Sequence, residues 1–278
     1  MGKSKVLVSI CCITFNHDKF IKECLEGFIK QKTNFNYEVL IYDDASTDNN
    51  AYIIKEYEKI YPNIIKPIYQ KENQFSKGVS LSLTYNFPRA QGKYIAMCEG
   101  DDYWTDPLKL QKQVDFLEGN PEYGICFHNV KIFDQANQKL IEDTITRDVE
   151  ETTDINELAK GNYIHTPSVM LRNDFTIPKW FKKSPVGDWS LYMLAIKDRK
   201  IKKLEDIMTV YRVHDTSIWS GLSQEVKNNK TKISINLIFK NVALPDKTKQ
   251  ILRNRLGLSK KKKSFLFKVF KKIKNKIK

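Results

Sequence analysis

Acidic side chains gather at two places in the first half of the chain. Asp43 and Asp44 close the apolar segment VLIYDD, and Glu99, Asp101 and Asp102 close the segment YIAMCEGDD. Carboxylates held close together repel one another, and a divalent cation relieves that repulsion. Mg²⁺ and Mn²⁺ prefer oxygen ligands and usually leave several coordination positions to water and substrate phosphates. The sequence therefore predicts a Mn²⁺ or Mg²⁺ site.

The elements around these acids alternate between strands and helices, as in parallel β-α-β units. The carboxyl ends of parallel strands line the ligand crevice of an open sheet, so we expect both acidic groups to face one site. Apolar runs and helical periods predict strands at residues 5–13, 37–42, 64–69 and 94–98 and helices at 18–32, 48–61, 79–91 and 107–119.

Capping is the alternative explanation for the acidic pairs, because Asp43 and Asp44 shortly precede the helix expected from residue 48. Gly100, in contrast, lets the backbone turn between carboxylates. Pro88 is expected to bend or shorten the helix at 79–91. At 107–119 we expect Asp106 as N-cap and Pro107 as the first helical residue.

The second half is less regular. We expect a strand and a polar loop within 124–149, then short helices and apolar runs over 150–222, including a helix that starts at Asp188. Residues 224–258 are predicted to be helical and polar. A Gly-rich dinucleotide motif, a P-loop and an HExxH zinc motif are absent, and the four histidines lie far apart in sequence: His17, His128, His165 and His214.

Three ordered motifs, VSICCITFN, YEVLIYDDASTDN and GKYIAMCEGDDYW, resemble the family 2 glycosyltransferases of bacterial surface-polysaccharide synthesis. The resemblance covers roughly residues 6–220. It implies an α/β GT-A (Rossmann-like) fold, in which helices flank a mostly parallel central sheet, followed by a helical basic C-terminal extension. The implied organisation is a GT-A domain at 1–222, with a nucleotide-sugar half at 1–102 and an acceptor half at 103–222, and an extension at 223–278.

The resemblance also implies roles for residues of the first half. Thr14, Phe15 and Asn16 would bind the nucleotide together with Asp43 and Asp44, and Asp44 would accept a hydrogen bond from a uracil-type N–H. The segment EGDD matches the DxD-type motif of the family. Asp101 would face the ribose or the metal, Asp102 would bind the metal that bridges the diphosphate, and Glu99 would join them, although many members carry Asp at that position. Tyr103 and Trp104 pack beside the site or in the core.

In the second half, the resemblance implies that Asp188 removes the proton of the acceptor hydroxyl, and an N-cap role is the alternative. The segment YRVHDTSIW is similar to the loop that closes over the donor. There, Arg212 would offset phosphate charge, and His214 would contact the pyrophosphate or complete the metal shell. A structural role is the alternative for His214.

The implied reaction is inverting transfer of a sugar from a nucleotide-diphosphate sugar, with UDP as the expected nucleotide. The acceptor would be a hydroxyl of a saccharide or lipid-linked saccharide. A non-catalytic protein of the same fold that binds nucleotide-sugars or a membrane surface is the alternative.

The basic charge is concentrated at the C-terminus. The chain has 278 residues and a formal charge of +14, and residues 259–278 hold ten lysines and no acid. This tail predicts an amphipathic helix on an anionic membrane surface. A solvated tail and a nucleic-acid contact are the alternatives, and no nucleic-acid partner is expected. Five scattered cysteines suggest buried thiols in a reducing compartment, so we expect a cytoplasmic protein, peripheral on the inner face of the plasma membrane.

Overall fold

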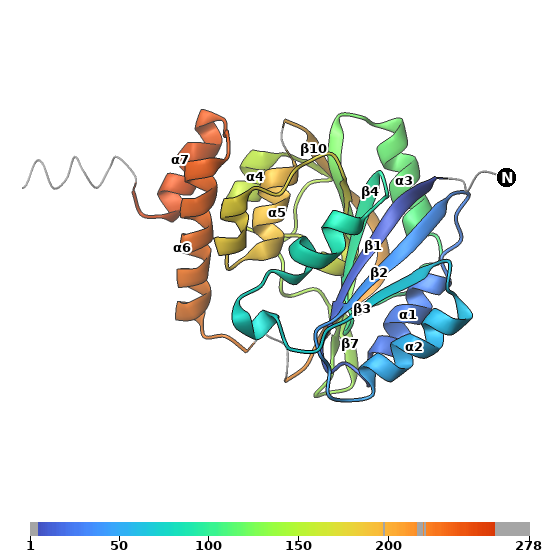
Figure 1. Ribbon diagram of the computed structural model, residues 1–278. Coiled ribbons are helices and arrows are strands. Elements are labelled where there is room, and N and C mark those ends of the chain that lie inside the picture. Colours follow the sequence, from blue (N-terminus) through green and yellow to red (C-terminus); the bar gives the residue numbers. More distant parts are fainter. Residues whose placement is uncertain (1–4, 197, 216–218, 220, 259–278) are drawn as a thin grey trace, which may run out of the picture.

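A ten-stranded mixed sheet runs through the centre of the molecule (Figure 1). The computed structural model describes residues 5–196, 198–215, 219 and 221–258. The main strand order is β3-β2-β1-β4-β9-β6-β10-β5, with β7 beside β6 and β8 beside β10. The strands are β1 (Val6–Thr14), β2 (Asn36–Asp43), β3 (Ile65–Tyr69), β4 (Tyr94–Glu99), β5 (Tyr103–Trp104), β6 (Tyr123–Asp134), β7 (Lys139–Glu142), β8 (Thr152–Thr153), β9 (Met170–Arg172) and β10 (Lys200–Val213).

Most of the sheet is parallel, as expected. β1 pairs in parallel with β2 and β4, β2 with β3, and β6 with β10. β9 is antiparallel to both β4 and β6, so these two strands share one direction across it. The carboxyl ends of β1, β2, β4, β6 and β10 therefore point to the same edge of the sheet.

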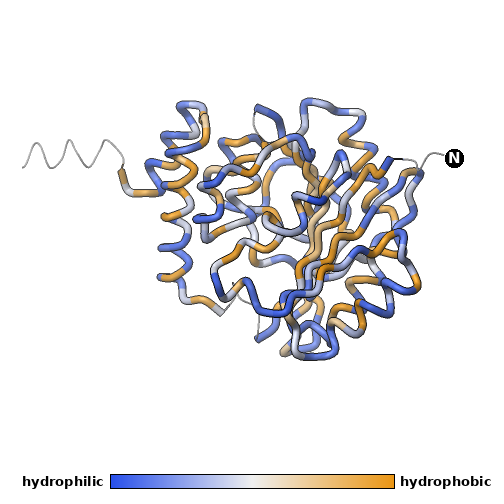
Figure 2. Tube along the Cα trace, viewed as in Figure 1, coloured by the Kyte–Doolittle hydropathy of each residue, from blue (hydrophilic) through white to orange (hydrophobic). Residues whose placement is uncertain are grey.

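Helices cover both faces of the sheet and bury two apolar layers. One layer joins strand residues such as Ile10 and Val39 to α1, α2 and α3, and the other joins Cys11 and Leu40 to the remaining helices. Figure 2 shows the hydrophobic strands of this interior. The helices are α1 (Ile21–Ile29), α2 (Asn50–Ile60), α3 (Lys109–Gly119), α4 (Ile155–Lys160), α5 (Gly187–Ala195), α6 (Gln224–Asn241) and α7 (Asp246–Arg255), with short turns η1 (Phe75–Lys77), η2 (Ser82–Asn86), η3 (Phe87–Arg89), η4 (Thr166–Ser168) and η5 (Lys179–Lys183).

Two predicted helices differ from the structure near proline. Residues 79–91 form a π-helical turn, η2, followed by the 3-10 turn η3, which contains Pro88. The buried Asn86 side chain donates to the Cys12 carbonyl and holds this turn against β1. The helix at 107–119 begins at Lys109 with Leu108 as N-cap, because the Pro107 carbonyl instead accepts from the Lys32 N–H in a preceding turn.

The sequence did not predict β10, the longest strand, nor the short strands β5, β7, β8 and β9. The helical segment expected at 224–258 consists of α6 and α7, which break at Pro245. All five cysteines are free and buried, as expected. Among the described residues, no helix is both long enough and apolar enough to cross a membrane. The tail at 259–278 lies outside the described residues, and the predicted domain boundaries stay predictions.

Candidate active site

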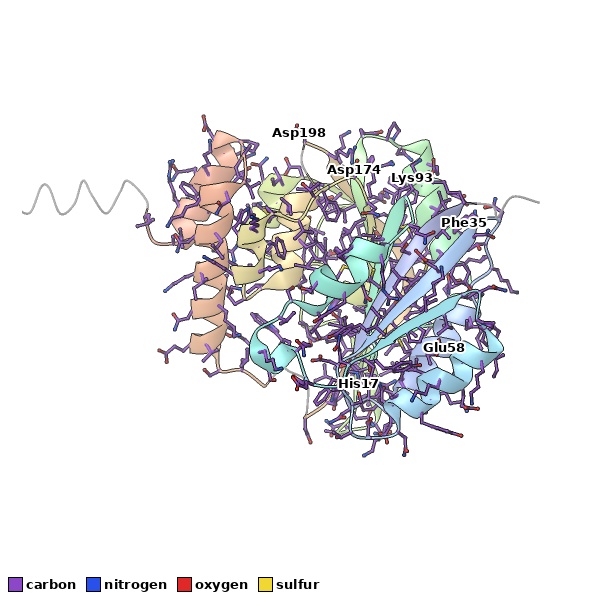
Figure 3. All side chains as sticks on the ribbon, viewed as in Figure 1. His17, Phe35, Glu58, Lys93, Asp174 and Asp198 are labelled. Carbon is purple, nitrogen blue, oxygen red and sulfur yellow. The ribbon has the colours of Figure 1, made fainter. Side chains whose placement is uncertain are left out.

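Three residues from distant parts of the chain meet at the carboxyl-end edge of the sheet. His17 follows β1, Asp101 follows β4 and His214 follows β10. Figure 3 shows His17 at this edge, away from Phe35 and Lys93, which precede β2 and β4 at the other end. The short strand β5 pairs antiparallel with β10 directly after the EGDD segment and so brings the end of β10 to Asp101.

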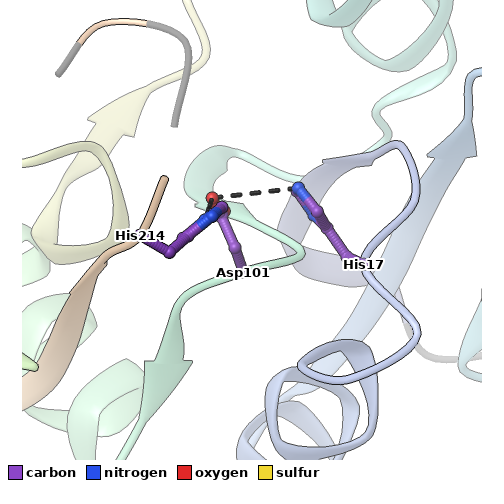
Figure 4. Close-up of side chains that lie close together, drawn as sticks. All are labelled: His17, Asp101 and His214. Atoms are coloured by element: carbon purple, nitrogen blue, oxygen red, sulfur yellow. Dashed lines mark hydrogen bonds and ion pairs between the residues drawn. The ribbon is translucent and has the colours of Figure 1, made fainter. Parts of the chain in front are cut away.

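The imidazole–carboxylate cluster consists of His17, Asp101 and His214 (Figure 4). His214 Nε2 lies 2.9 Å from Asp101 Oδ2, and His17 Nε2 lies 3.8 Å from the same oxygen. The candidate ligand atoms all lie within 4.8 Å of one another. One carboxylate oxygen and two imidazole nitrogens form a donor set that suits Mn²⁺ and other divalent ions.

The charge states within the cluster also suit a cation. Burial favours neutral Asp101, but the hydrogen bond from His214 and the adjacent His17 together lower the pKa of Asp101 below its ordinary value. Burial lowers the pKa of His17 despite the opposing charge of Asp101. A carboxylate and a neutral imidazole are the forms that bind metals. The sequence analysis did not identify His17 as a candidate ligand, although His17 comes shortly after the first strand. The expectation that residues at the carboxyl ends of parallel strands line the ligand site applies to His17 as well as to the acids.

Arg212 ties the EGDD segment to the end of β10. Its backbone N–H donates to Asp102 Oδ1 at 2.7 Å, and its Nε donates to the Asp101 carbonyl at 2.8 Å. Its guanidinium also pairs with Glu23 and stacks on the Tyr103 ring, while Trp104 is buried in the core. These contacts occupy much of the guanidinium, and a phosphate contact of Arg212 stays a prediction.

Glu99 and Asp102 lie next to the cluster but outside it. Each has a buried carboxylate oxygen, Glu99 Oε2 and Asp102 Oδ2, that has no hydrogen-bond partner within the described parts of the chain. Burial and nearby carboxylates raise the pKa of Glu99 to about 8 and also raise that of Asp102. Such oxygens fit a bound cation or ligand, so the two predicted metal roles remain predictions. A Cβ at Gly100 would lie 2.5 Å from the Thr14 hydroxyl, so this close approach needs glycine.

Asp43 and Asp44 hold loops rather than cap a helix. Asp43 accepts from the Asn50 side chain, and the two Asp44 oxygens accept from the N–H groups of Gln74 and Phe75 at 2.8 and 2.9 Å. Asp48, which accepts from the Asn50 N–H, takes the place at the start of α2. Asp43 also accepts from the Ser46 N–H and so caps the turn after β2, but neither acid of the pair is the N-cap of α2.

The other predicted nucleotide residues lie beside them. The buried Thr14 hydroxyl donates to the Asn50 side chain, and Asn16 Oδ1 accepts from the Thr47 N–H at 2.8 Å. Asn16 has a φ of 54°, a left-handed conformation that Asn tolerates, and Phe15 is 41% exposed. The predicted nucleotide-binding residues therefore share one edge, and Phe15 presents a free ring face. A cleft of about 310 Å³ opens beside them, lined by Asn16, Asp18, Lys19, Phe20, Gln135, Ala136, His214 and Asp215.

Asp188 stands in the first turn of α5. The N-cap position of this helix is Val186, but the Asp188 carboxylate makes backbone hydrogen bonds at Asp188 and Trp189, so Asp188 also stabilises the start of the helix. Asn162 Nδ2 donates to Asp188 Oδ2 at 2.8 Å, and Asn162 Oδ1 accepts from the Ile164 N–H at 3.2 Å. Because a backbone N–H can only donate, that contact fixes the amide orientation and turns the NH₂ group toward Asp188. We refer to these two residues as the Asp188 pair.

Burial raises the pKa of Asp188 above its ordinary value, even though the Asn162 amide and the neighbouring His165 favour its charged form. Asp188 in turn is one cause of the raised pKa of Glu99. Asp188 therefore lies within electrostatic reach of the EGDD segment, at the start of a helix that belongs to the second half of the chain.

The segment at 164–168, to which the sequence assigns no residue roles, packs against Trp104 beside the EGDD segment. Its Pro167 carbonyl accepts from Trp104 Nε1 at 3.0 Å, and His165 Nε2 lies 2.9 Å from Asp143 Oδ2. Sequence reasoning missed Asn162, Asp143 and His165 because no motif links them. They become neighbours only when this segment folds across the sheet.

The mixed sheet with helices on both faces has the arrangement of a GT-A fold. The model of the family described as "Glycosyl transferase family 2" matches residues 9–176. The chain therefore belongs to glycosyl transferase family 2. The matched residues include the EGDD segment and end before Asp188 and His214.

Curated relatives agree with this assignment. An uncharacterized protein of Mycobacterium tuberculosis is 38% identical over 215 residues, which cover 76% of this chain and 60% of that protein. The chain thus spans about 60% of the length of this relative. The UDP-Glc:alpha-D-GlcNAc-diphosphoundecaprenol beta-1,3-glucosyltransferase WfgD of Escherichia coli is 25% identical over 223 residues, which cover 80% of this chain and 83% of WfgD.

Solved structures share the fold. S. aureus TarS 1-349 in complex with UDP-GlcNAc has a TM-score of 0.67 at 18% identity, with 90% of this chain and 72% of that chain covered. The mannosyltransferase PcManGT from Pyrobaculum calidifontis, in complex with GDP-Man and Mn²⁺, has a TM-score of 0.62 at 15% identity, with 90% and 68% covered. These likenesses confirm the GT-A fold that the sequence motifs implied.

Proposed function

We propose that this protein is a metal-dependent inverting glycosyltransferase that uses a nucleotide-diphosphate sugar, with UDP as the nucleotide. The observation that carries the proposal is the imidazole–carboxylate cluster, in which His17, Asp101 and His214 converge at the carboxyl ends of three strands. Membership in glycosyl transferase family 2 and the ligands named for TarS and PcManGT support it.

In this proposal, Asp101, His214 and His17 hold Mn²⁺ or Mg²⁺, and Asp102 and Glu99 complete its surroundings with their unpartnered oxygens. When bound, the cation supplies positive charge that stabilises the leaving diphosphate. Thr14, Phe15, Asn16, Asp43 and Asp44 form the nucleotide edge.

Asp188 is the proposed general base. Asn162 donates to Asp188 Oδ2 and, together with backbone N–H groups at Asp188 and Trp189, holds the carboxylate that would accept the proton of the acceptor hydroxyl. The acceptor oxygen attacks the anomeric carbon, its proton passes to Asp188, and the bond from that carbon to the nucleoside diphosphate breaks. A single displacement of this kind inverts the anomeric centre. Because burial raises the pKa of Asp188, its carboxylate is a stronger base than an exposed aspartate.

We propose a saccharide or lipid-linked saccharide as the acceptor, in cell-surface polysaccharide synthesis. The similarity to WfgD, a transferase that acts on a diphosphoundecaprenol-linked sugar, supports this class. The predicted peripheral position on the inner face of the plasma membrane, through residues 259–278, agrees with such an acceptor. Liposome co-sedimentation of the full chain and a 1–258 truncation tests the tail, and equal binding by the two would remove that part of the proposal.

Calorimetry of UDP binding, with and without Mn²⁺, tests the donor site. We expect binding that needs Mn²⁺ in the wild type and is weakened in Asp102→Ala, with thermal melts to check that the variant folds. Turnover of UDP-sugars with a lipid-linked acceptor follows, and NMR of the product reads the anomeric configuration. Absence of binding by UDP, GDP and CMP would contradict the proposal.

A further inference from the structure

The basic charge of the chain begins before the tail, at the start of α6. Residues 1–223 carry 29 basic and 31 acidic side chains, a net charge of −2, whereas residues 224–278 carry 18 basic and 2 acidic ones, a net charge of +16. Of these, α6, α7 and the residues to 258 hold eight basic and two acidic side chains. A folded part of the molecule therefore shares the charge of the tail.

The lysines of residues 224–258 also differ from those of residues 1–223, the main body, in how many of them form ion pairs. Many body lysines pair with a carboxylate, as in Lys30–Glu26, Lys59–Glu56 and Lys93–Glu118. Among the residues that the structure describes, no carboxylate lies within ion-pair distance of Lys230, Lys232, Lys240 or Lys247. Lys230, Lys232 and Lys240 on α6 therefore have no ion-pair partner among the described residues, whereas on α7 Lys249 pairs with Asp246 and Lys247 interacts electrostatically with Asp154.

The inner face of α6 fixes this surface to the active-site half of the molecule. Ile235 and Ile238 are buried in the core. The buried Ser234 hydroxyl accepts from the Ser184 hydroxyl at 2.9 Å and from the Val186 N–H at 3.1 Å. Val186 is the N-cap of the helix that carries Asp188. α6 therefore packs against the start of α5, the helix that carries the proposed base Asp188.

The outer face of α6 combines positive charge with exposed apolar side chains. Val226 is 40% exposed and Ile233 is 51% exposed, and Lys232 and Lys240 are exposed as well. Residues 226 and 233 are seven positions apart, which places their side chains on one side of the helix. Figure 1 shows α6 and α7 together along one side of the molecule, away from α1, α2 and α3.

We propose that the outer face of α6 is a docking surface for an anionic lipid bilayer. Uncompensated lysines attract an anionic bilayer, and exposed aliphatic side chains between them gain free energy at its interface. A nucleic acid would use the charge but would leave Val226 and Ile233 without a partner. The inference goes beyond the tail because the contact lies on a folded platform and therefore sets the orientation of the site.

Orientation is the functional consequence. α6 starts at Gln224, ten positions after His214 at the carboxyl-end edge of the sheet. A bilayer along α6 therefore holds the proposed acceptor side at a fixed angle to the lipid surface. This consequence rests on the proposed function, whereas the binding surface itself does not.

The test uses the full chain and vesicles of phosphatidylcholine with roughly one-third phosphatidylglycerol. Because each lysine at an anionic surface contributes about fivefold in affinity, we expect Lys230→Gln, Lys232→Gln and Lys240→Gln together to weaken vesicle binding by about 100-fold. A matched control neutralises the paired body lysines Lys30 and Lys59 and leaves binding within about twofold. Sugar transfer to a soluble acceptor is measured in parallel. Unchanged vesicle binding by the lysine variant would contradict this inference alone, whereas absence of sugar transfer by the wild type would contradict the enzyme proposal alone.

A second variant reports the contact directly. The side chain of Ile233→Trp should shift its fluorescence to shorter wavelength on anionic vesicles and remain unchanged with neutral ones. Vesicle binding by the lysine variant within twofold of the wild type, or an unshifted Trp signal, would overturn the proposal. Loss of binding to a short RNA without loss of binding to vesicles would also overturn it, in favour of a nucleic-acid surface.

Discussion

Asp101 and Asp188 are both aspartates beside the candidate active site, and their surroundings shift their pKa values in opposite directions. In the imidazole–carboxylate cluster, His214 and His17 lower the pKa of Asp101 in spite of its burial. In the Asp188 pair, burial prevails and raises the pKa of Asp188 even though an amide is bound to it. A carboxylate kept charged suits a cation, and one with a raised pKa suits proton transfer.

The difference arises from the kind of neighbour. Asp101 faces two imidazoles, which can carry positive charge. Asp188 is hydrogen-bonded to neutral groups, namely the Asn162 amide and backbone N–H groups at Asp188 and Trp189, and has one nearby imidazole, that of His165. A neutral donor favours a carboxylate less than a cation does, so it offsets only part of the effect of burial. The two regions can therefore be separated by substitutions that affect metal binding on one side and proton transfer on the other.

The largest expected effect is the loss of the proposed base. Asp188→Asn keeps the shape of the side chain but cannot take a proton, so we expect kcat to fall by about 10²–10⁴-fold. Mn²⁺-dependent UDP binding should stay near the wild-type value, because Asp188 lies outside the cluster. Steady-state kinetics and calorimetry measure the two properties, and Asp115→Asn on the exposed side of α3 is the control. Nearly normal turnover would move the base to another residue.

Asp101→Asn should have the converse effect. Removing the charged oxygen shared by the two histidines should weaken Mn²⁺ binding by about 100-fold or more and remove metal-dependent UDP binding. Titration of the wild type with a chelator should reproduce the loss, and added Mn²⁺ should restore it. Full activity in the presence of excess chelator would contradict a metal role for the cluster.

A third prediction compares one histidine from each region, His17 of the imidazole–carboxylate cluster and His165 near Asp188. His17→Ala should weaken Mn²⁺ affinity by roughly 10–100-fold, because it removes one candidate ligand. His165→Ala, on the Asp188 side, should leave Mn²⁺ affinity unchanged, and electron paramagnetic resonance of bound Mn²⁺ distinguishes the two. If both variants bind Mn²⁺ like the wild type, His17 is not a ligand.

The smallest effect is expected for Asn162→Ala. The hydrogen bond to the Asp188 carboxylate is charge-assisted, so its loss should lower kcat by about tenfold. It should also raise the pKa of Asp188 further, because the charged form loses a partner, and the acidic limb of the kcat profile should move to higher pH. Asp188 also interacts electrostatically with four other titratable groups, those of Glu99, His165, Tyr192 and Tyr211. A lower kcat with an unmoved profile would indicate a purely structural role.

Elements with strong local patterns could be predicted from the sequence. The strand that ends in the EGDD segment, β4, is a short apolar run bounded by polar residues, and the helix from Asp188 has a clear apolar period. β10 escaped prediction because its first half is rich in charge. Lys202 and Lys203 become acceptable in that strand only because Glu151 and Asp148, from an earlier loop, pair with them.

The functions of single side chains depended on contacts that no spacing encodes. The two Asp44 oxygens accept from the Gln74 and Phe75 N–H groups of a distant loop, and no spacing in the sequence indicates these contacts. Arg212 reads as a phosphate ligand, yet it binds the EGDD segment and Glu23. His17 and His214 lie at opposite ends of the domain sequence and meet because β10 pairs with β6 and β5 in the same sheet as β1.

The sequence by itself determined the parallel strands, the edge at which they end and the acids available there, because these follow from local periodicity and residue type. The tertiary structure alone decided which acids remain available and which are bound to backbone amides, and which imidazoles share a carboxylate. The physical reason is that a pKa and a ligand set depend on burial and on neighbours a few ångströms away. Long-range packing chooses those neighbours.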